Sequence, residues 1–324
     1  MVGRLIEMFA NRTNGIDPTP GFFIIGAPKC GTTSLAAWLG EHPNVYVTPI
    51  KEPRYFSSDI GNQRTRTREE YTRLFCGVRP EHKAIGEAST TYLFSKNAVQ
   101  RIEDFNPRAR YIVMLRNPVD MAYSLHEQHI RSGNEDIDDF QEAWRLSEER
   151  REGLMTPDGC MDSTLLDYKS WCLLGQQLKR IYEIVSRERV LVLLLDDMKV
   201  NPGVEYRRVL SFLGVPDDER KQFPIYNPAR EWRTKWLGRT TRHLARSVAW
   251  AKHISHILPN RSFGLVSSLQ KVNSKQRRRP ELSQDLRREL EDFFYDDTLL
   301  LEQVIGRQLP HCNVGRDTKS LSSK

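Results

Sequence analysis

Short apolar runs alternate with longer segments of helical periodicity along most of the chain. The runs have the length of buried strands and lie at 22–25, 44–47, 84–89, 110–115 and 190–195. Uniformly apolar runs such as 110–115 and 190–195 are typical of strands that are covered on both faces. The pattern therefore predicts an α/β fold with a mainly parallel central sheet flanked by helices.

Helical periodicity and capping residues mark the segments between these strands. Gly214 follows one of them as a C-cap, and Ser283 precedes the last one as an N-cap. Residues 57–70 are polar and predict a surface loop that leads into a helix. The expected helices begin at Thr33–Ser34 and at about Val119, and cover 134–152, 165–186, 203–213 and 283–305.

The segment between the first strand and the first helix carries the clearest chemical signal. Gly26 and Gly31 have the G-x4-G spacing of a nucleotide-binding phosphate loop, but Thr32 stands where that motif has its lysine. The lysine lies inside the loop instead, as Lys29. Small residues let the backbone wrap an anion, and N–H groups at a helix start point toward it. The loop therefore predicts a phosphate-rich ligand and disfavours an ordinary ATP site.

A second chemical signal stands at the end of the run 110–115. Arg116 is expected at the carboxyl edge of the sheet, where open α/β folds bind ligands, and Ser124 follows two helical turns later. A guanidinium fork and a hydroxyl suit a phosphate. A purely structural interpretation fits equally well, in which Arg116 caps the edge of a strand and Ser124 packs within a helix.

A Mg²⁺-dependent NTPase would need a strand that ends in Asp. The candidate pair Asp196–Asp197 comes late in the chain, so the NTPase class is a weak alternative.

Several segments, in order along residues 20–310, resemble sulfotransferases that use 3′-phosphoadenosine 5′-phosphosulfate (PAPS), in particular the carbohydrate group of the heparan-sulfate type. Pro28–Thr33 is similar to the 5′-phosphosulfate loop, and Arg116-x-Pro118 with Ser124 is similar to the 3′-phosphate motif. Lys51–Phe56 is similar to the KEPxFF element, and Gly86–Ser89 is similar to the element that follows it. Leu210–Val215 also matches a stretch of this family. That group often has Lys where this chain has Ala88. One motif alone is a moderate signal, whereas the ordered set is a strong one.

The resemblance implies a P-loop-like, three-layer fold and transfer of a sulfuryl group from PAPS to a hydroxyl or amine of a carbohydrate, glycolipid or small molecule. It makes Lys29 the group that stabilises the leaving phosphate and Glu52 the general base. Such a transfer requires no metal. The residues implied in PAPS binding are Lys29, Cys30, Gly31, Thr32, Thr33 and Ser34 at the 5′-phosphate, Arg116 and Ser124 at the 3′-phosphate, and Lys275 and Arg277 in a basic stretch that closes over the ligand.

Other interpretations of single residues stay open. Glu52 also fits the ribose-binding acid of a dinucleotide fold, although the G-x-G-x-x-G fingerprint is absent. It equally fits an ordinary surface acid that is paired with Lys51 or Arg54. His129 is a second candidate for the catalytic base or a substrate contact, against a structural role in its helix. Cys30 is expected to be a small tolerated side chain rather than a nucleophile.

Composition narrows the class of protein further. With 324 residues and 39% hydrophobic content the chain can bury a sizeable core. No run of about 18 apolar residues predicts a membrane span, and the first residues lack the apolar region of a signal peptide. Five Cys residues form no CxxC pair and no metal-ligand spacing, which favours a reducing compartment. With the resemblance, these features predict a bacterial cytoplasmic enzyme, with an isolated lumenal domain as the less favoured alternative.

The net charge of +7 is concentrated in one segment. Residues 231–279 hold twelve Lys or Arg and one acid, so the rest of the chain is mildly acidic. Within this segment, 235–258 has the periodicity of a basic amphipathic helix with Trp residues. Such a helix suits an anionic membrane surface, an acidic glycan or a solvated face. Charge alone permits nucleic acid, but no recognised motif supports it.

We expect one domain over 18–310, with an N-terminal extension over 1–17 and a C-terminal tail over 311–324. The sequence does not predict the oligomeric state or the acceptor. Two other classes remain beside the sulfotransferase: a Mg²⁺-dependent nucleotide kinase, and a non-catalytic protein that binds the nucleotide and turns nothing over.

Overall fold

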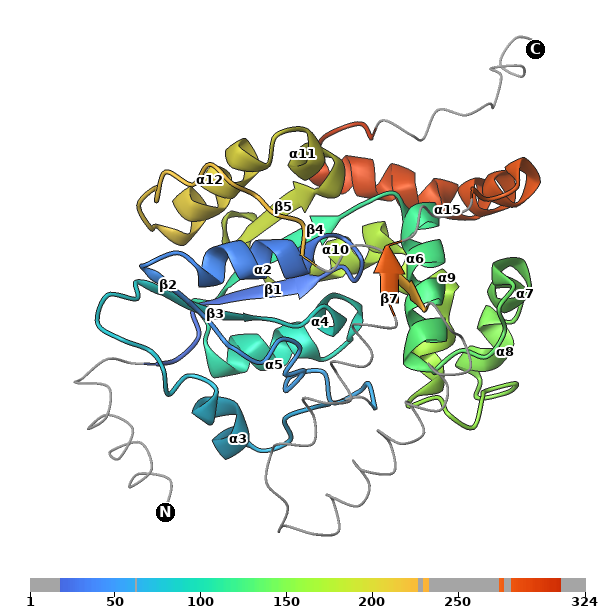
Figure 1. Ribbon diagram of the computed structural model, residues 1–324, viewed down its shortest axis with the longest axis horizontal. Helices are drawn as coiled ribbons and strands as arrows, with labels where there is room; N and C mark the ends of the chain where they lie inside the picture. Colours follow the sequence, from blue (N-terminus) through green and yellow to red (C-terminus); the bar gives the residue numbers. More distant parts are fainter. Residues whose placement is uncertain (1–17, 62, 227–229, 233–273, 277–280, 310–324) are drawn as a thin grey trace. The chain divides into compact units, whose positions relative to one another are not determined.

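The computed structural model describes residues 18–61, 63–226, 230–232, 274–276 and 281–309 (Figure 1). The chain divides into two compact units, which are described separately. The first unit comprises residues up to 122, 169–224 and the segment from 284, and the second comprises 123–168 and 225–283. The single domain expected over 18–310 and the extensions expected on either side of it stay predictions.

The first unit is built on a five-stranded parallel sheet in the order β2–β3–β1–β4–β5. The strands span Phe22–Gly26 (β1), Val45–Val47 (β2), Ala84–Ala88 (β3), Arg110–Leu115 (β4) and Val190–Leu194 (β5). β1 lies at the centre, and all of its residues are buried. The parallel sheet predicted from the apolar runs is therefore confirmed.

β1 and β3 approach each other closely because Gly86 has no side chain. Gly86 pairs with Phe22, and a Cβ at Gly86 would lie 2.3 Å from the Phe22 carbonyl oxygen. Phe23, the next residue of β1, stacks on Tyr111 of β4 with ring centroids 6.2 Å apart. Burial of a large apolar side chain contributes about 1.5–3 kcal/mol, so this packing fixes β1 between its two neighbours.

Helices cover both faces of the sheet (Figure 1). Their bounds are Thr32–Gly40 (α2), Arg68–Arg73 (α3), Thr91–Phe94 (α4), Ala98–Phe105 (α5), Leu174–Ile184 (α10), Leu195–Val200 (α11), Pro202–Leu213 (α12) and Gln284–Ile305 (α15). α2 and α12 lie on one face, where Trp38 of α2 meets Tyr206 of α12 edge to face. α4, α5 and α10 lie on the opposite face, and α15 packs along α10. α12 ends at Gly214, whose φ of 70° is the left-handed conformation of the predicted C-cap.

The amphipathic segment 165–186 is broken, and the single helix predicted there is wrong. It forms the end of a 3₁₀ turn, η1 (Ser163–Leu166), then α9 (Tyr168–Trp171) and α10. The cause lies in α15, where the Asp297 carboxylate accepts hydrogen bonds from the Gly175 and Gln176 amides at 2.8 and 2.9 Å. Amides at a helix N-terminus lack partners within the helix, so Asp297 caps α10 at its start.

The second unit contains α6 (Pro118–Ser132) from residue 123 onward, α7 (Phe140–Arg145) and α8 (Ser147–Arg151). The helix predicted over 134–152 is wrong in its first part. Glu135 Oε1 accepts hydrogen bonds from the Asp136 and Ile137 amides, both at 2.9 Å, and such local bonds compete with helical ones. α7 begins only after Asp139, whose carboxylate accepts from the Glu142 amide at 2.8 Å.

β5 is less buried than its apolar sequence predicts. The expectation of burial on both faces is wrong for Leu191, Val192 and Leu194, which are only half-buried. β5 is one of the two edge strands of the sheet, so it has a strand neighbour on one side only. An apolar run therefore identifies the strand but not its place in the sheet.

The basic segment is described only near its ends, where β6 (Arg230–Trp232) pairs antiparallel with β7 (Ser274–Gln276). Lys275 is part of β7, whereas Arg277 and the helix expected over 235–258 lie outside the described residues. Their roles in PAPS binding and at an anionic surface stay predictions. In the part of the chain that the structure describes, no helix is both long and apolar enough to cross a membrane.

Asp297→Ala is expected to lower the free energy of unfolding by about 1–3 kcal/mol, because the first amides of α10 lose their partner. Urea unfolding followed by circular dichroism measures the change. Asp296 is exposed on the same helix, so Asp296→Ala is the matched control, with an expected change within about 0.5 kcal/mol. Equal effects of the two substitutions would show that the Asp297 cap does not stabilise the fold.

Candidate active site

The phosphate loop connects β1 to α2 and turns sharply. Two of its residues have left-handed backbone, Lys29 with a φ of 64° and Gly31 with a φ of 88°. Gly31 is also the N-cap of α2, and it has no side chain with which to cap the helix. The first amides of α2 therefore lie at the loop with the positive end of the helix dipole. This arrangement suits a bound anion.

The side chains of the loop alternate in exposure. Lys29, Gly31 and Thr33 are partly exposed, whereas Cys30, Thr32 and Ser34 are buried. Burial raises the pKa of the Cys30 thiol to about 12, although the nearby charges of Arg116 and Lys29 oppose the rise. The thiol is therefore protonated at neutral pH, and Cys30 packs in the loop rather than offering a nucleophile.

Arg116 follows β4 and reaches the phosphate loop. Its Nη1 donates a hydrogen bond to the Lys29 carbonyl at 3.1 Å, and its side chain is 13% exposed. Its Nε is buried and has no hydrogen-bond partner among the residues that the structure describes. A buried polar group without a partner is costly, and an anionic oxygen would satisfy it with a charge-assisted bond. Arg116 and the loop are therefore joined in one region whose donors suit an anion.

Asp120 links Arg116 to α15. Its Oδ2 lies 3.6 Å from Arg116 Nη2, and its Oδ1 accepts a hydrogen bond from Arg287 Nη2 at 3.2 Å. One carboxylate thus faces two guanidinium groups, and Arg287 also pairs with Glu291 at 3.5 Å. Neither Asp120 nor Arg287 was predicted as a partner of this site. The i,i+4 spacing of Arg116 and Asp120 was a usable signal, whereas nothing local indicates Arg287.

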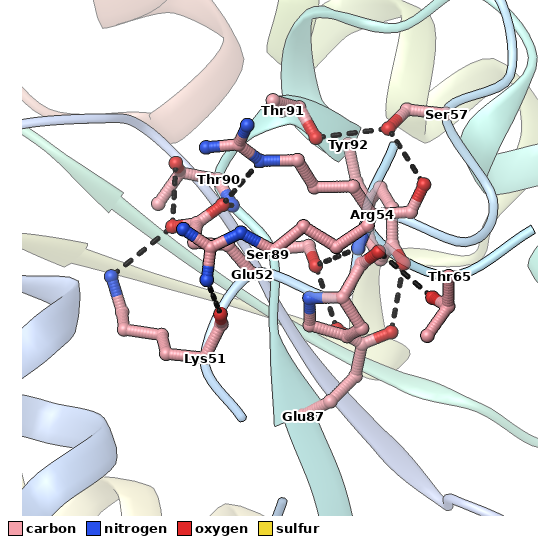
Figure 2. Close-up of polar contacts among 12 residues, drawn as sticks. Lys51, Glu52, Arg54, Ser57, Thr65, Glu87, Ser89, Thr90, Thr91 and Tyr92 are labelled. Carbon is pink, nitrogen blue, oxygen red and sulfur yellow. Dashed lines mark hydrogen bonds and ion pairs between the residues drawn. The ribbon is translucent and has the colours of Figure 1, made fainter. Parts of the chain in front are cut away.

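Glu52 lies in the loop after β2 and is surrounded by hydrogen-bond donors (Figure 2). Its carboxylate accepts from the Thr90 amide and the Thr90 hydroxyl, each at 3.0 Å. It also pairs with Lys51 Nζ at 3.1 Å and with Arg54 Nε at 3.4 Å. The Thr90 carbonyl packs against Gly26, 3.2 Å from where a Cβ would lie. Glu52 therefore sits beside the start of the phosphate loop.

Glu52 is largely shielded from solvent, with 13% of its side chain exposed, and it is paired. Burial by itself would raise its pKa, but the charges of Lys51 and Arg54 and the hydrogen bonds from Lys51 and Thr90 outweigh that effect and hold the pKa below its usual value. Glu52 is therefore ionised at neutral pH and able to accept a proton. The ion pairs that the surface-acid interpretation expects are present as well, so this geometry is compatible with both interpretations of Glu52.

The backbone of the Glu52 loop has an unusual conformation. Glu52 and Arg54 have φ values of 60° and 56°, and left-handed backbone at a residue other than glycine costs of order 1–3 kcal/mol. Hydrogen bonds to the segment after β3 offset this cost. The Glu52 amide donates to the Ala88 carbonyl at 2.9 Å, and the Arg54 amide donates to Ser89 Oγ at 3.0 Å.

Glu87 of β3 is a buried carboxylate close to this loop (Figure 2). It accepts hydrogen bonds from the hydroxyls of Tyr71, Ser89 and Tyr92 at 3.0, 2.7 and 2.8 Å. Burial raises the pKa of Glu87 to about 7, even though the three hydrogen bonds oppose the rise. From the sequence Glu87 was predicted only as part of a motif, and no sequence pattern shows that hydroxyls gather on it.

Ser124 and His129 belong to the second unit, and both are buried. His129 packs against Tyr168 with ring centroids 6.1 Å apart, and its Nδ1 lies 3.5 Å from the side-chain nitrogen of Asn134. These are the contacts of a packed side chain. A catalytic role for His129 and a phosphate contact for Ser124 stay predictions.

The acids considered for an NTPase lie in α11 rather than at the end of a strand. Asp196 pairs with Lys199 at 2.7 Å. Asp197 accepts a hydrogen bond from Arg307 at 2.9 Å, and that interaction holds its pKa below the usual value. Both acids therefore already have cationic partners.

A model of the sulfotransferase domain family matches residues 19–227, which is more than half of the chain. The chain therefore belongs to this family. The matched region contains the phosphate loop, the Glu52 loop, Glu87 and Arg116. The resemblance inferred from the motifs is confirmed.

Individual relatives agree with this assignment. The crystal structure of a sulfotransferase from Alicyclobacillus acidocaldarius has 31% sequence identity and a TM-score of 0.64, over 90% of this chain and 97% of that one, so the P-loop-like fold is confirmed. Carbohydrate sulfotransferase 15 of Mus musculus is 29% identical over 253 residues, 63% of this chain and 45% of that protein. Bifunctional heparan sulfate N-deacetylase/N-sulfotransferase 1 of Caenorhabditis elegans is 23% identical over 298 residues, 89% of this chain and 30% of that protein. The chain spans less than half the length of these two curated relatives.

Glu87 makes stability depend on pH in a definite direction. Its pKa is about 7 in the folded protein, against an ordinary value of 4.5. Between these values the folded protein binds a proton that the unfolded chain does not, so the contribution of Glu87 to the unfolding free energy falls as pH rises.

Glu87→Gln removes this titration. Relative to the wild type, its unfolding free energy is expected to rise by about 2 kcal/mol between roughly pH 5 and pH 8. Urea unfolding at both pH values measures the difference. A difference between variant and wild type that stays constant with pH would contradict the raised pKa.

Proposed function

We propose that this protein transfers the sulfuryl group of PAPS to a hydroxyl or amine of a carbohydrate, glycolipid or small acceptor and leaves adenosine 3′,5′-bisphosphate. The observation that carries the proposal is the junction of the phosphate loop with Arg116. The first amides of α2 have no side-chain cap there, and the buried Nε–H of Arg116 has no partner among the described residues. The hydrogen bond from Arg116 to the Lys29 carbonyl joins these two sets of donors. Two sets of donors suit a ligand with two phosphate groups. Membership of the sulfotransferase family supports the same reaction.

During the transfer the bond between sulfur and the 5′-phosphate oxygen breaks, and sulfur bonds to the acceptor oxygen or nitrogen. Negative charge grows on the leaving phosphate, and Lys29 with the first amides of α2 neutralises it. Arg116 is proposed to bind the 3′-phosphate that distinguishes PAPS from ATP, and the same role for Ser124, Lys275 and Arg277 stays a prediction. The acceptor loses a proton as the new bond forms, so a base is needed beside it.

Glu52 is the proposed base because it is ionised and lies beside the start of the phosphate loop. Both of its oxygens already accept hydrogen bonds, so the acceptor must replace one of the donors. Lys51 suits this exchange because its side chain is 32% exposed and its stem is flexible.

The surroundings of Glu52 favour an acceptor with negative charge. Lys51 and Arg54 both pair with Glu52, and Arg64 donates from Nη1 to the Lys51 carbonyl at 3.1 Å. Three cations around one carboxylate leave an excess of positive charge, which attracts an acidic substrate. The names of the mouse and nematode relatives refer to carbohydrate and heparan sulfate, which supports a glycan as the acceptor. The cytoplasmic location and contact with a membrane stay predictions.

Arg116→Ala is expected to weaken the binding of adenosine 3′,5′-bisphosphate about 10–100-fold, because a charge-assisted hydrogen-bond donor is lost. Isothermal titration calorimetry without Mg²⁺ measures this affinity. Arg108 is exposed just before the same strand, so Arg108→Ala is the control and should bind like the wild type. A wild type that prefers ATP with Mg²⁺ would favour the nucleotide-kinase alternative instead.

Glu52→Gln is expected to lower kcat about 10²–10⁴-fold, because Gln keeps the shape of Glu but cannot take a proton. Affinity for the bisphosphate should not change. Turnover is measured with PAPS and a panel of acidic and neutral glycans, with Glu69→Gln on the exposed side of α3 as the control. Retained turnover would place the base elsewhere, with His129 as the next candidate. Tight bisphosphate binding without wild-type turnover of any acceptor would support the non-catalytic alternative.

A further inference from the structure

Glu87 differs from Glu52 in its partners, because three neutral hydroxyls donate to it, whereas Glu52 also pairs with two cations. Its Oε1 accepts hydrogen bonds from the Tyr71 and Tyr92 hydroxyls, and its Oε2 accepts one from the Ser89 hydroxyl. The side chain is fully buried. Burial of a carboxylate among neutral donors is unfavourable relative to a neutral side chain, so stability alone does not account for an acid at this position.

Two of these hydroxyls have a second partner in the loop that follows β2, and Figure 2 shows the one at Ser89. Ser89 Oγ accepts from the Arg54 amide at 3.0 Å, and the Tyr92 hydroxyl oxygen accepts from the Phe56 amide at 3.4 Å. A hydroxyl has one proton to donate. Because both protons go to Glu87, both oxygens are left to accept hydrogen bonds from the loop. Glu87 thus sets the direction of the two hydroxyls.

We propose that Glu87 is a positioning residue for sulfuryl transfer, which holds the Glu52 loop in place by orienting the hydroxyls of Ser89 and Tyr92. The inference rests on the proposed function, since it concerns the placement of the proposed base. The left-handed backbone at Glu52 and Arg54 persists only where its surroundings hold it. Without the two anchors the loop relaxes, and the Glu52 carboxylate moves away from the phosphate loop.

A carboxylate suits this task better than an amide. An ionised Glu only accepts hydrogen bonds, so each hydroxyl near it must donate. A Gln at position 87 also offers N–H groups. A hydroxyl that accepts a hydrogen bond from this Gln turns its own proton away from position 87 and toward the loop. The geometry therefore makes the charge of Glu87, and not only its shape, part of the anchor.

Tyr71 supplies a matched control within the same network. Its hydroxyl donates to the same oxygen of Glu87 as the Tyr92 hydroxyl does, and both side chains are fully buried. Tyr71 contacts the loop through its ring, which stacks on Tyr55 with centroids 4.6 Å apart. Tyr71→Phe keeps that ring contact. It therefore removes a donor to Glu87 without removing an anchor of the loop.

Amide hydrogen exchange on the full chain at pH 8, where Glu87 is ionised, tests the anchors without any acceptor. Tyr92→Phe is expected to speed exchange at the Phe56 amide about tenfold, and Ser89→Ala to do so at the Arg54 amide, because each amide loses its acceptor. Glu87→Gln is expected to speed both. Tyr71→Phe should leave both unchanged. Equal responses to Tyr71→Phe and Tyr92→Phe, or no response to Glu87→Gln, would overturn the inference.

Steady-state kinetics with PAPS and an acceptor that the wild type uses test the catalytic consequence. Ser89→Ala, Tyr92→Phe and Glu87→Gln are expected to lower kcat about tenfold with an unchanged KM for PAPS, because the base is misplaced while the donor site is intact. Tyr71→Phe should retain wild-type kcat. A change confined to the KM for PAPS, or an unchanged kcat, would overturn the positioning role. If the wild type transfers no sulfuryl group, the proposed function fails, and the exchange experiment still decides whether Glu87 holds the loop.

Discussion

In a parallel sheet the carboxyl ends of neighbouring strands reach the same edge, and β1 has such neighbours on both sides, β3 and β4. The backbone ladder continues past the strands. The Ala27 amide donates to the Met114 carbonyl at 2.6 Å, and the Ser89 amide donates to the Ile24 carbonyl at 3.0 Å. The segments that leave these strands are therefore tied together at their first residues. This pairing brings Arg116 to the phosphate loop and the partners of the Glu52 loop to its start.

Each group of cations in the site is held by a carboxylate before any ligand arrives. Two guanidinium groups share Asp120, and Lys51 and Arg54 share Glu52. Among the described residues positive charge is left over around Glu52, where Arg64 joins Lys51 and Arg54, and the cations at both places are already oriented. Preorganised cations stabilise charge that develops during a reaction without a cost of reorganisation. Under the proposed function, this arrangement explains how one site accepts a donor with two phosphate groups and an acidic acceptor.

The predicted fold was accurate where neighbouring residues decide the structure. The apolar runs identified all of the strands in the parallel sheet, and Gly214 ended its helix as predicted, because strand patterning and a left-handed C-cap depend on adjacent residues. The segment 165–186 shows the limit. Its periodicity is that of a helix, but the Asp297 carboxylate caps it in the middle. Such a cap comes from a distant part of the chain, so no local pattern contains it.

For the site, neighbouring residues were enough to predict the phosphate loop, the position of Arg116 after a strand and the motif around Glu52, because each depends on residues a few positions apart. How the carboxylates find their donors depends on the tertiary fold. Asp120 bonds to Arg287, 167 residues away, and hydroxyls from three separate positions converge on Glu87. A carboxylate removed from water must find donors within the fold, and which side chains supply them depends on packing that the order of residues alone does not show.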